Sequence, residues 1–158
     1  MTKTNDVDRY LRFSLGIEEY AIPLLDVKEV IAMPEVTPIP QTPTHFLGIM
    51  NLRGQVITIM DLRLKLGIKA EKGAETSVII TDLGEISVGV VVDSINAVLN
   101  PNPKDLAEKP ELSNGVKSSE YITGVYKKES GLVLLLNIPK LLNFEDKKIA
   151  TQATKKAA

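Results

Sequence analysis

The sequence predicts an all-β protein with short helices, of the barrel class. Short apolar segments rich in Val, Ile and Leu recur along the whole chain. Gly, Pro, Asn and Asp separate these segments about every ten residues, which is typical of strands joined by tight turns. Few stretches show the period of a long helix, so helices are expected only as short connections.

The first part of the chain predicts two strands and a helix. Residues 1–7 are polar and are expected to form a flexible tail. Residues 10–15 and 19–22 are predicted strands on either side of a turn. A short helix is predicted for residues 24–32, because apolar residues recur there at helical spacing. These residues are Leu24, Val27, Val30 and Ile31.

A central hairpin within residues 46–66 is the clearest element of the sequence. Before it, four prolines in residues 34–43 favour an extended segment at a sheet edge. The hairpin turns at Arg53 and Gly54, where the glycine suits a position with positive φ and lets the arginine project from the tip. Both faces of its strands are largely apolar, so the hairpin is expected in the core. Residues 62–66 then predict a turn of helix.

The second half predicts two further hairpins and a closing helix. Residues 95–99 continue the earlier of these hairpins, and residues 100–118 read as loop with one helical turn after Pro103. Residues 138–144 predict a short helix, and residues 146–158 are expected to form a flexible tail. The hairpin strands are expected at residues 77–82, 86–92, 121–126 and 132–136.

Composition excludes several classes of protein. A chain of 158 residues is long enough for one domain, or for two small barrels, without a metal or disulfide. It contains no Cys, which excludes a disulfide framework and a cysteine nucleophile. Its net charge of −1 removes the electrostatic basis for binding nucleic acid. No apolar segment is long enough for membrane insertion, so the chain is expected to be soluble and cytoplasmic.

Few residues of the chain are candidates for catalysis or for binding a metal or a nucleotide. His45 is the only histidine, and beside a proline-rich turn it is expected to be a structural or surface residue. No nucleotide-binding glycine loop is present, the residues show no catalytic motif, and we expect no metal site or cofactor. Chemistry that uses carboxylates alone stays open. Read in isolation, Arg53 is a solvated charge at a hairpin tip and Glu29 a polar residue of its helix face. The residues by themselves therefore predict a β-barrel binding module.

Several motifs in order resemble the CheW coupling proteins of bacterial chemotaxis. The resemblance runs from about Tyr10 to Phe144. One departure is Thr58, at a position where the family frequently carries proline, and we expect only a local backbone effect there. The motifs that carry the resemblance are FSLGIEEYAIPLLDVKEVI, TPIPQTPTHFLGIMNLRGQVITIMDLR, VGVVVDSINAVL, YITGV and LLLNIPKLL.

The resemblance implies a fold and a role. The fold would be one CheW-like domain over residues 8–145, made of two five-stranded SH3-like β-barrel subdomains around a shared core. The role would be that of a non-enzymatic scaffold that couples chemoreceptor (methyl-accepting chemotaxis protein) signalling tips to the regulatory domain of the CheA histidine kinase. Such a protein is recruited from the cytoplasm to membrane-associated receptor arrays. A coupling protein of a pilus-motility or other chemosensory-like pathway, and a small ligand-binding or carboxylate-using barrel, stay open as alternatives.

The resemblance also implies two sets of site residues. An apolar groove for a receptor helix, with charged residues at its edge, would be formed by Leu24, Val27, Glu29, Val30, Gly48, Arg53 and Ile95. We further expect a Glu29–Arg53 ion pair at the edge of that groove. The kinase-binding surface would use Val36, Leu52, Val56 and Leu112.

Overall fold

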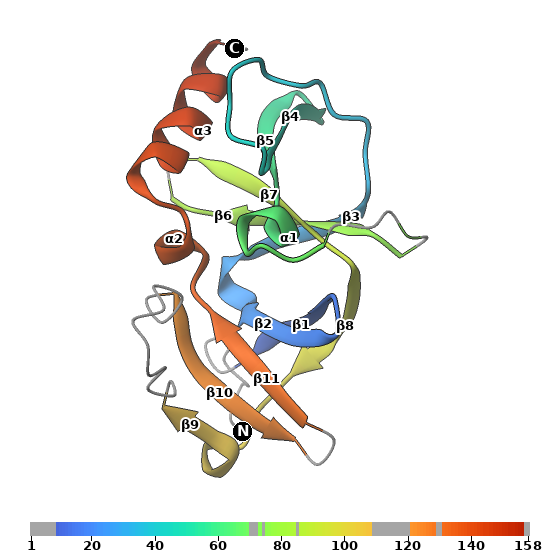
Figure 1. Ribbon diagram of the computed structural model, residues 1–158, viewed down its shortest axis with the longest axis vertical. Helices are drawn as coiled ribbons and strands as arrows, with labels where there is room; N and C mark the ends of the chain where they lie inside the picture. The colour runs from blue at the N-terminus through green and yellow to red at the C-terminus, as the bar shows by residue number, and fades with distance from the viewer. Residues whose placement is uncertain are drawn as a thin grey trace.

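The chain folds into two β-sheets with short helices between and beside them (Figure 1). The computed structural model describes residues 9–69, 73, 75–84, 86–108, 121–128 and 131–156. Within these residues, one sheet has six strands in the order β8-β1-β2-β11-β10-β9, and we call it the terminal sheet. The other has five strands in the order β3-β6-β7-β5-β4, and we call it the middle sheet.

The names of the sheets follow their place in the chain. The terminal sheet contains β1 (Tyr10–Leu15), β2 (Glu18–Pro23), β8 (Ser94–Leu99), β9 (Leu106–Glu108), β10 (Ile122–Lys128) and β11 (Gly131–Leu136). The middle sheet contains β3 (Val27–Ala32), β4 (Phe46–Leu52), β5 (Gln55–Asp61), β6 (Ser77–Asp82) and β7 (Ser87–Val92). Most pairs are antiparallel, but β2 pairs with β11 in parallel and β5 with β7 likewise.

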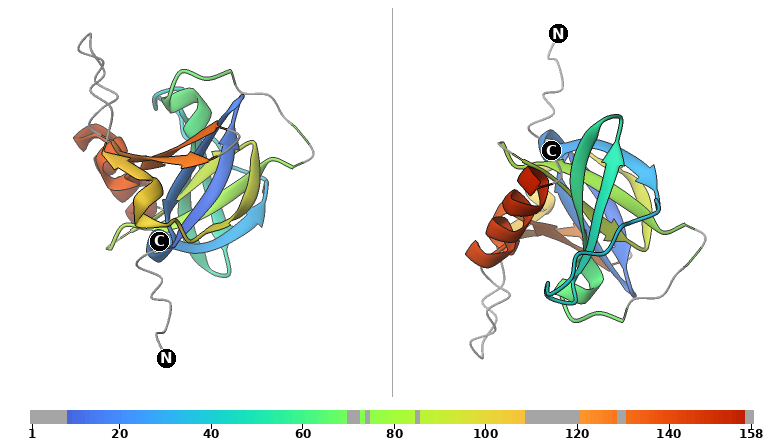
Figure 2. Two further views of the ribbon diagram at one scale, coloured as in Figure 1. Left: turned by 90° about the horizontal axis from the view of Figure 1, so that it is seen from below. Right: turned by 90° about the horizontal axis from the view of Figure 1, so that it is seen from above.

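The chain therefore crosses between the sheets twice in going from strand to strand. The first crossover is the 3₁₀ turn η2 (Leu24–Asp26), which connects β2 to β3. The second is Asp93, the single residue between β7 and β8. After β11 the chain returns to the middle sheet, where α3 (Phe144–Lys156) packs against β5 on the flank of the molecule (Figure 2).

The buried apolar side chains form three clusters, of which one joins the two sheets. The largest takes buried side chains from both sheets and forms a shared core, with Phe13, Leu15, Ile22, Met60, Ile79, Val90 and Leu136 among its members. A second cluster belongs to the middle sheet and consists of Ile57, Ile59, Val78, Ile80 and Val91. A third belongs to the terminal sheet and consists of Ala21, Val133 and Leu135. The predicted fold class, a mostly β protein with two subdomains around a shared core, is confirmed, although the terminal sheet has six strands instead of five.

Alternation along the middle strands explains their nearly continuous apolar sequence. On β6, Ile79 enters the shared core while Val78 and Ile80 enter the middle cluster. On β5, Met60 likewise enters the shared core and Ile59 enters the middle cluster. Successive side chains of a strand point to opposite faces, so a strand that is buried on both faces needs apolar residues at every position.

The predicted helix over residues 24–32 is wrong. Only Leu24–Asp26 is helical, as a 3₁₀ turn, and Val27–Ala32 is strand β3, paired with β6. Val27, Val30 and Ile31 are β-branched, which favours a strand once a partner strand is available. Residues 95–99 form a strand as predicted, but β8 does not continue the β6–β7 hairpin: it pairs with β1 in the terminal sheet. The helical turn predicted after Pro103 is confirmed by η3 (Pro103–Asp105).

The prediction of a flexible tail over residues 146–158 is wrong for most of its length. The predicted closing helix is two helices, α2 (Ile138–Leu141) and α3 (Phe144–Lys156). Ala150 on α3 is buried in the shared core. Residues 1–7 and 157–158, also expected to be flexible, lie outside the described residues.

Candidate docking surface

The tip of the β4–β5 hairpin presents Arg53 to solvent. Arg53 and Gly54 have φ of 52° and 87°, the pair of positive values that characterises a type I′ hairpin turn. The backbone N–H of Gly54 donates to Asn51 Oδ1 at 2.8 Å, which fixes the turn. Arg53 Nη2 donates to Glu29 Oε1, so the predicted ion pair is confirmed. The Arg53 side chain is 72% exposed and the Glu29 side chain 30%, as expected of a pair at the surface.

A shallow hollow of about 450 Å³ lies beside this pair. It is lined by Lys28, Glu29, Leu52, Arg53, Gln55, Ile57 and Ile80. Leu52 was predicted for the kinase surface, and Glu29 and Arg53 for the receptor surface. The structure therefore places one residue of the predicted kinase surface beside two residues of the predicted receptor surface.

An irregularity in β3 decides which of its residues share a face. Val27 pairs with Thr81, but Glu29 pairs with Ile80 and Val30 with Ile79, so Lys28 is an extra residue in the ladder. Residues that oppose each other in a ladder lie on the same face of the sheet. Val27 and Val30 therefore share one face of β3, whereas Glu29 lies on the other, toward the hollow.

The apolar residues predicted for the receptor groove lie next to the crossovers. Leu24, Val27 and Ile95 are half-buried and pack against the shared core. Val30 is 39% exposed, the most accessible of the predicted apolar groove residues. Leu24 is in the first crossover, and Ile95 follows the second by two residues.

Gly48 has a structural role in this arrangement. It is buried at an irregularity of β4, with φ of 144°, and a Cβ there would overlap the carbonyl of Thr37. Thr37 and Ile49 form a β-bridge through two backbone hydrogen bonds of 2.8 and 2.9 Å. Only a glycine lets the segment before β4 approach the strand this closely.

The residues predicted for kinase binding lie on the middle sheet and its edge. Val36 and Leu52 are half-buried and pack on the middle cluster. Val56 is half-buried on β5, opposite Asn51. Leu112 lies outside the described residues.

A buried charge network at the start of α1 (Leu62–Lys65) was not predicted. Asp61 caps this helix by accepting from the backbone N–H of Arg63 at 2.9 Å. The guanidinium of Arg63 donates to both Asp61 oxygens at 3.0 Å and to Asp93 Oδ1 at 2.7 Å. Hydrogen bonds to Asp61 raise the pKa of Arg63 above its ordinary value, although burial opposes this. In the sequence, the string DLR at residues 61–63 indicates a helix cap at Asp61. It gives no sign of the distant partner, Asp93.

A second polar cluster docks α3 and was also missed. Asp146 is buried and accepts from Lys65 Nζ at 2.7 Å, and it hydrogen-bonds His45 Nε2 at 2.8 Å. Its backbone N–H donates to Asn143 Oδ1 at 2.7 Å, which caps the helix. Burial raises the pKa of Asp146, but hydrogen bonds from Lys65 and His45 outweigh burial and bring it below its ordinary value. His45 is thus a structural residue, as expected.

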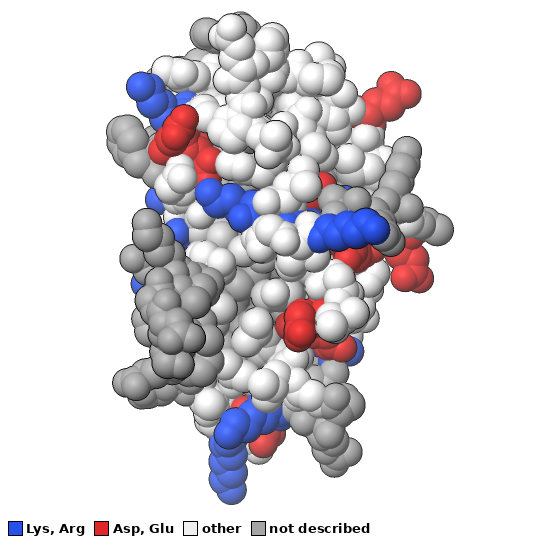
Figure 3. All heavy atoms as spheres, in the orientation of Figure 1, with Lys and Arg blue, Asp and Glu red and all other residues white. Residues whose placement is uncertain are grey.

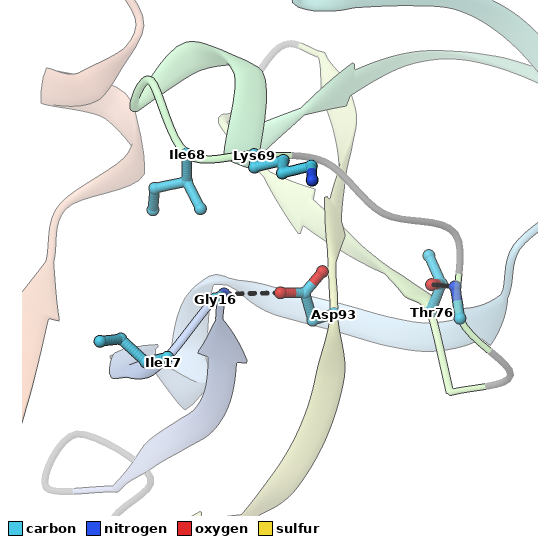
Figure 4. A pocket seen from close by; sticks show the side chains of 7 residues that line it. Gly16, Ile17, Ile68, Lys69, Thr76 and Asp93 are labelled. Carbon is cyan, nitrogen blue, oxygen red and sulfur yellow. Dashed lines mark hydrogen bonds between the residues drawn. The ribbon is translucent and has the colours of Figure 1, made fainter.

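Another hollow, of about 460 Å³, lies between the β1–β2 turn and the segment after α1 (Figure 4). Gly16, Ile17, Ile68, Lys69, Gly73, Thr76 and Asp93 line it. Ile17 is almost fully exposed at the tip of the turn. In the part of the chain that the structure describes, no group of His, Asp and Glu side chains is arranged to hold a metal ion. On the face shown in Figure 3, acidic and basic side chains are interspersed.

Comparison with known proteins decides the family. The CheW-like domain model matches residues 9–146, nearly the whole described fold. The chain belongs to the CheW family of chemotaxis scaffold proteins. It is 35% identical to the chemotaxis protein CheW of Klebsiella aerogenes over 150 residues, covering 92% of this chain and 88% of that one. It is 32% identical to CheW of Helicobacter pylori over 138 residues, covering 87% and 82%.

A solved CheW structure has the same fold. The crystal structure of the scaffolding protein TtCheW from Thermoanaerobacter tengcongensis matches with a TM-score of 0.78 at 26% identity. The match covers 88% of this chain and 94% of that one. Among the described residues of this CheW-family chain, no helix is both long and apolar enough to cross a membrane.

Proposed function

We propose that this CheW-family chain is a non-catalytic adaptor that couples the cytoplasmic signalling tips of chemoreceptors to the regulatory domain of the CheA histidine kinase. The observation that carries the proposal is the family match over residues 9–146, together with relatives named as chemotaxis CheW proteins. The two hollows, which open at the surface, agree with a protein that binds other proteins. Recruitment to receptor arrays follows from receptor binding.

The receptor helix is proposed to lie along the free edge of β3. Among the described strands, β3 ends the middle sheet, and Val27, Glu29 and Val30 along it are all at least partly exposed. Val27 and Val30 on one face would contact the apolar stripe of the helix, with Leu24 and Ile95 beside them. Glu29 and Arg53 on the other face would fix its position through polar contacts. Gly48 would contribute indirectly, by allowing the Thr37 bridge.

The kinase regulatory domain is proposed to contact the β4–β5 hairpin. Val36, Leu52 and Val56 would supply the apolar contacts, because they are only half-buried on the middle sheet. Because Leu52 and Arg53 are neighbours at one hollow, the two partners would meet near the hairpin tip. Leu112 is proposed as a further contact with the array.

Binding of each partner separately tests the proposal. Isothermal titration calorimetry would measure affinity for a receptor signalling-tip fragment and for an isolated CheA regulatory domain. Binding to both is expected, with Val30→Glu reducing only receptor binding and Val56→Asp, outside the hollow, reducing only kinase binding. Lys127→Ala, an exposed substitution on the terminal sheet, is the control and should change neither. Absence of binding to both partners would contradict the proposed function.

A further inference from the structure

The second crossover between the sheets carries a charged residue whose carboxylate is held by hydrogen bonds. Asp93 is the only residue between β7 of the middle sheet and β8 of the terminal sheet. Both oxygens of its carboxylate are used: Oδ1 accepts from Arg63 Nη1 at 2.7 Å and Oδ2 from the backbone N–H of Gly16 at 2.6 Å. Figure 4 shows the carboxylate directed at Gly16, in the turn between β1 and β2.

The other end of this network is buried. Arg63 and Asp61 are only 5% and 3% exposed, and their side chains meet through two parallel hydrogen bonds of 3.0 Å. A bidentate pair of this kind fixes orientation as well as distance. Asp61 is the last residue of β5, so the network begins on the middle sheet. It ends at the Gly16 turn of the terminal sheet. We call Asp61, Arg63 and Asp93 the clasp.

We propose that the clasp positions the receptor surface by fixing the β7–β8 crossover, and with it the setting of the two sheets relative to each other. This inference rests on the proposed function, because it assigns the clasp to the receptor surface. Asp93 and Arg63 are positioning residues and not receptor contacts: Arg63 is buried, and Asp93 acts through the strand that follows it.

Ile95 connects the clasp to the receptor surface. It follows Asp93 by two residues and pairs with Phe13 of the shared core. The backbone N–H of Asp93 donates to the Ser14 carbonyl at 3.0 Å, and Asn96 Nδ2 donates to Ser14 Oγ at 2.9 Å. The start of β8 is thereby held against β1 at the point where the clasp ends. Val27 and Val30, the partners of Ile95 in the proposed surface, lie on the other sheet. Their distance from Ile95 therefore depends on the relative orientation of the two sheets.

Asp93→Ala tests the inference with the least risk to folding. It removes the contacts to Gly16 and Arg63 but leaves the buried Asp61–Arg63 pair intact, unlike Arg63→Ala, which would leave the buried Asp61 carboxylate without its partner. Asp105→Ala is the matched control, because it removes the same charge from an exposed position on η3. The chain has no Cys, so spin labels can be attached through two introduced cysteines alone. Ala32→Cys on β3 and Lys127→Cys on β10 place one label on each sheet at exposed positions.

Two readouts decide the inference. Pulsed electron paramagnetic resonance should show a shifted or broadened distance distribution in Asp93→Ala and an unchanged one in Asp105→Ala. Receptor-fragment binding by unlabelled Asp93→Ala should weaken at least about tenfold, the scale of a lost charge-assisted hydrogen bond, while kinase-domain binding changes less than about twofold. A merely structural residue would lower thermal stability without separating the two affinities.

Contrary outcomes are equally definite. A folded Asp93→Ala with the wild-type distance distribution overturns the inference. A changed distribution with unchanged receptor affinity also overturns it, because the clasp would then not position the receptor surface. A wild-type protein that binds neither partner would instead contradict the proposed function, and the inference with it, although the distances would still show whether the clasp sets the sheets.

Discussion

Glu29 on β3 and Arg53 at the tip of the β4–β5 hairpin form an ion pair that joins the two ends of the middle sheet. In the order β3-β6-β7-β5-β4 these elements belong to opposite sides of the sheet, so the sheet must curl to bring them together. The Thr37–Ile49 bridge covers the edge of β4 in the same region. The pair therefore marks where the middle sheet closes toward a barrel, at the hollow proposed for docking.

Arg53→Ala should impair coupling with little effect on the fold. An exposed ion pair contributes only about 0–1 kcal/mol to stability, so the melting temperature should change little. Receptor binding should weaken, because the polar edge of the docking surface loses its cation. Calorimetric binding and thermal unfolding of the same protein measure both effects. A fall in melting temperature above about 5 °C would show instead that Arg53 stabilises the fold.

A double-mutant cycle separates the ion pair from the turn. In Arg53→Ala the alanine must still adopt the positive φ of the turn, which is unfavourable for a non-glycine residue. Glu29→Ala carries no such backbone cost. Glu29→Ala, Arg53→Ala and the double variant together give the coupling energy of the pair. We expect a coupling energy below about 1 kcal/mol for unfolding. A much larger value would mean that closure of the sheet depends on this pair.

Val30→Glu should abolish receptor binding while the protein stays folded. Val30 is exposed on the same face of β3 as Val27, so an added carboxylate meets the receptor and not the core. Val27→Glu should also abolish binding, but at a cost in stability, because Val27 packs against the shared core. Binding titrations with the receptor fragment and the kinase domain measure the effect. Loss of both affinities in folded Val30→Glu would contradict the proposed separation of partners.

Gly48→Ala should destabilise the fold. The added Cβ would overlap the Thr37 carbonyl at a backbone position with φ of 144°. Relief requires breaking the Thr37–Ile49 bridge, so we expect a loss of several kcal/mol, as for other strained backbone sites. Urea unfolding measures it, with Gly84→Ala at the β6–β7 turn as a control with positive φ but no nearby atoms. Equal stability of the two variants would show that contact with Thr37 is unimportant.

Asp146→Asn should remove part of the pH dependence of stability. The pKa of Asp146 is lowered in the folded protein, so its carboxylate stabilises the fold fully above the unfolded value of about 3.9 and loses this effect as pH falls through the folded pKa. Wild-type melting temperature should therefore fall more steeply between about pH 5 and pH 2 than that of Asp146→Asn. At pH 7 the variant should be less stable by about 1–3 kcal/mol, because the buried partners lose a charged acceptor.

The control for this prediction is Asp105→Asn, at an exposed carboxylate on η3. It should leave the pH profile of the wild type unchanged. Identical profiles for wild type and Asp146→Asn would mean that the cluster of His45, Lys65 and Asp146 does not contribute to stability through charge.

The elements that sequence predicts well are those with local causes. The Arg53–Gly54 turn and its two strands follow from a tight turn between apolar segments, and the structure confirms them. Residues 24–32 mislead for a physical reason. Val27 and Val30 are three residues apart, as on one face of a helix, but they share a face because Lys28 is an extra residue in the β3–β6 ladder. Spacing along the chain cannot distinguish these two cases.

The elements that sequence misses depend on distant contacts. Helix α3 is polar, and its docking depends on Asp146 contacting residues 81 and 101 positions earlier in the chain. The clasp likewise joins Arg63 to Asp93, 30 positions later. The Glu29–Arg53 pair was expected only because of the family resemblance, since residues 24 positions apart give no local signal. Long-range polar partners of this kind are the part of the site that one sequence does not reveal.

Kinase stimulation tests the central claim most directly. CheA autophosphorylation would be measured in a reconstituted mixture with receptor signalling fragments, with this protein, without it, and with Val30→Glu in its place. The proposed function predicts strong stimulation by the wild-type protein that disappears with Val30→Glu. Autophosphorylation that is the same with and without the wild-type protein, although it binds the kinase regulatory domain, would contradict coupling to these receptors.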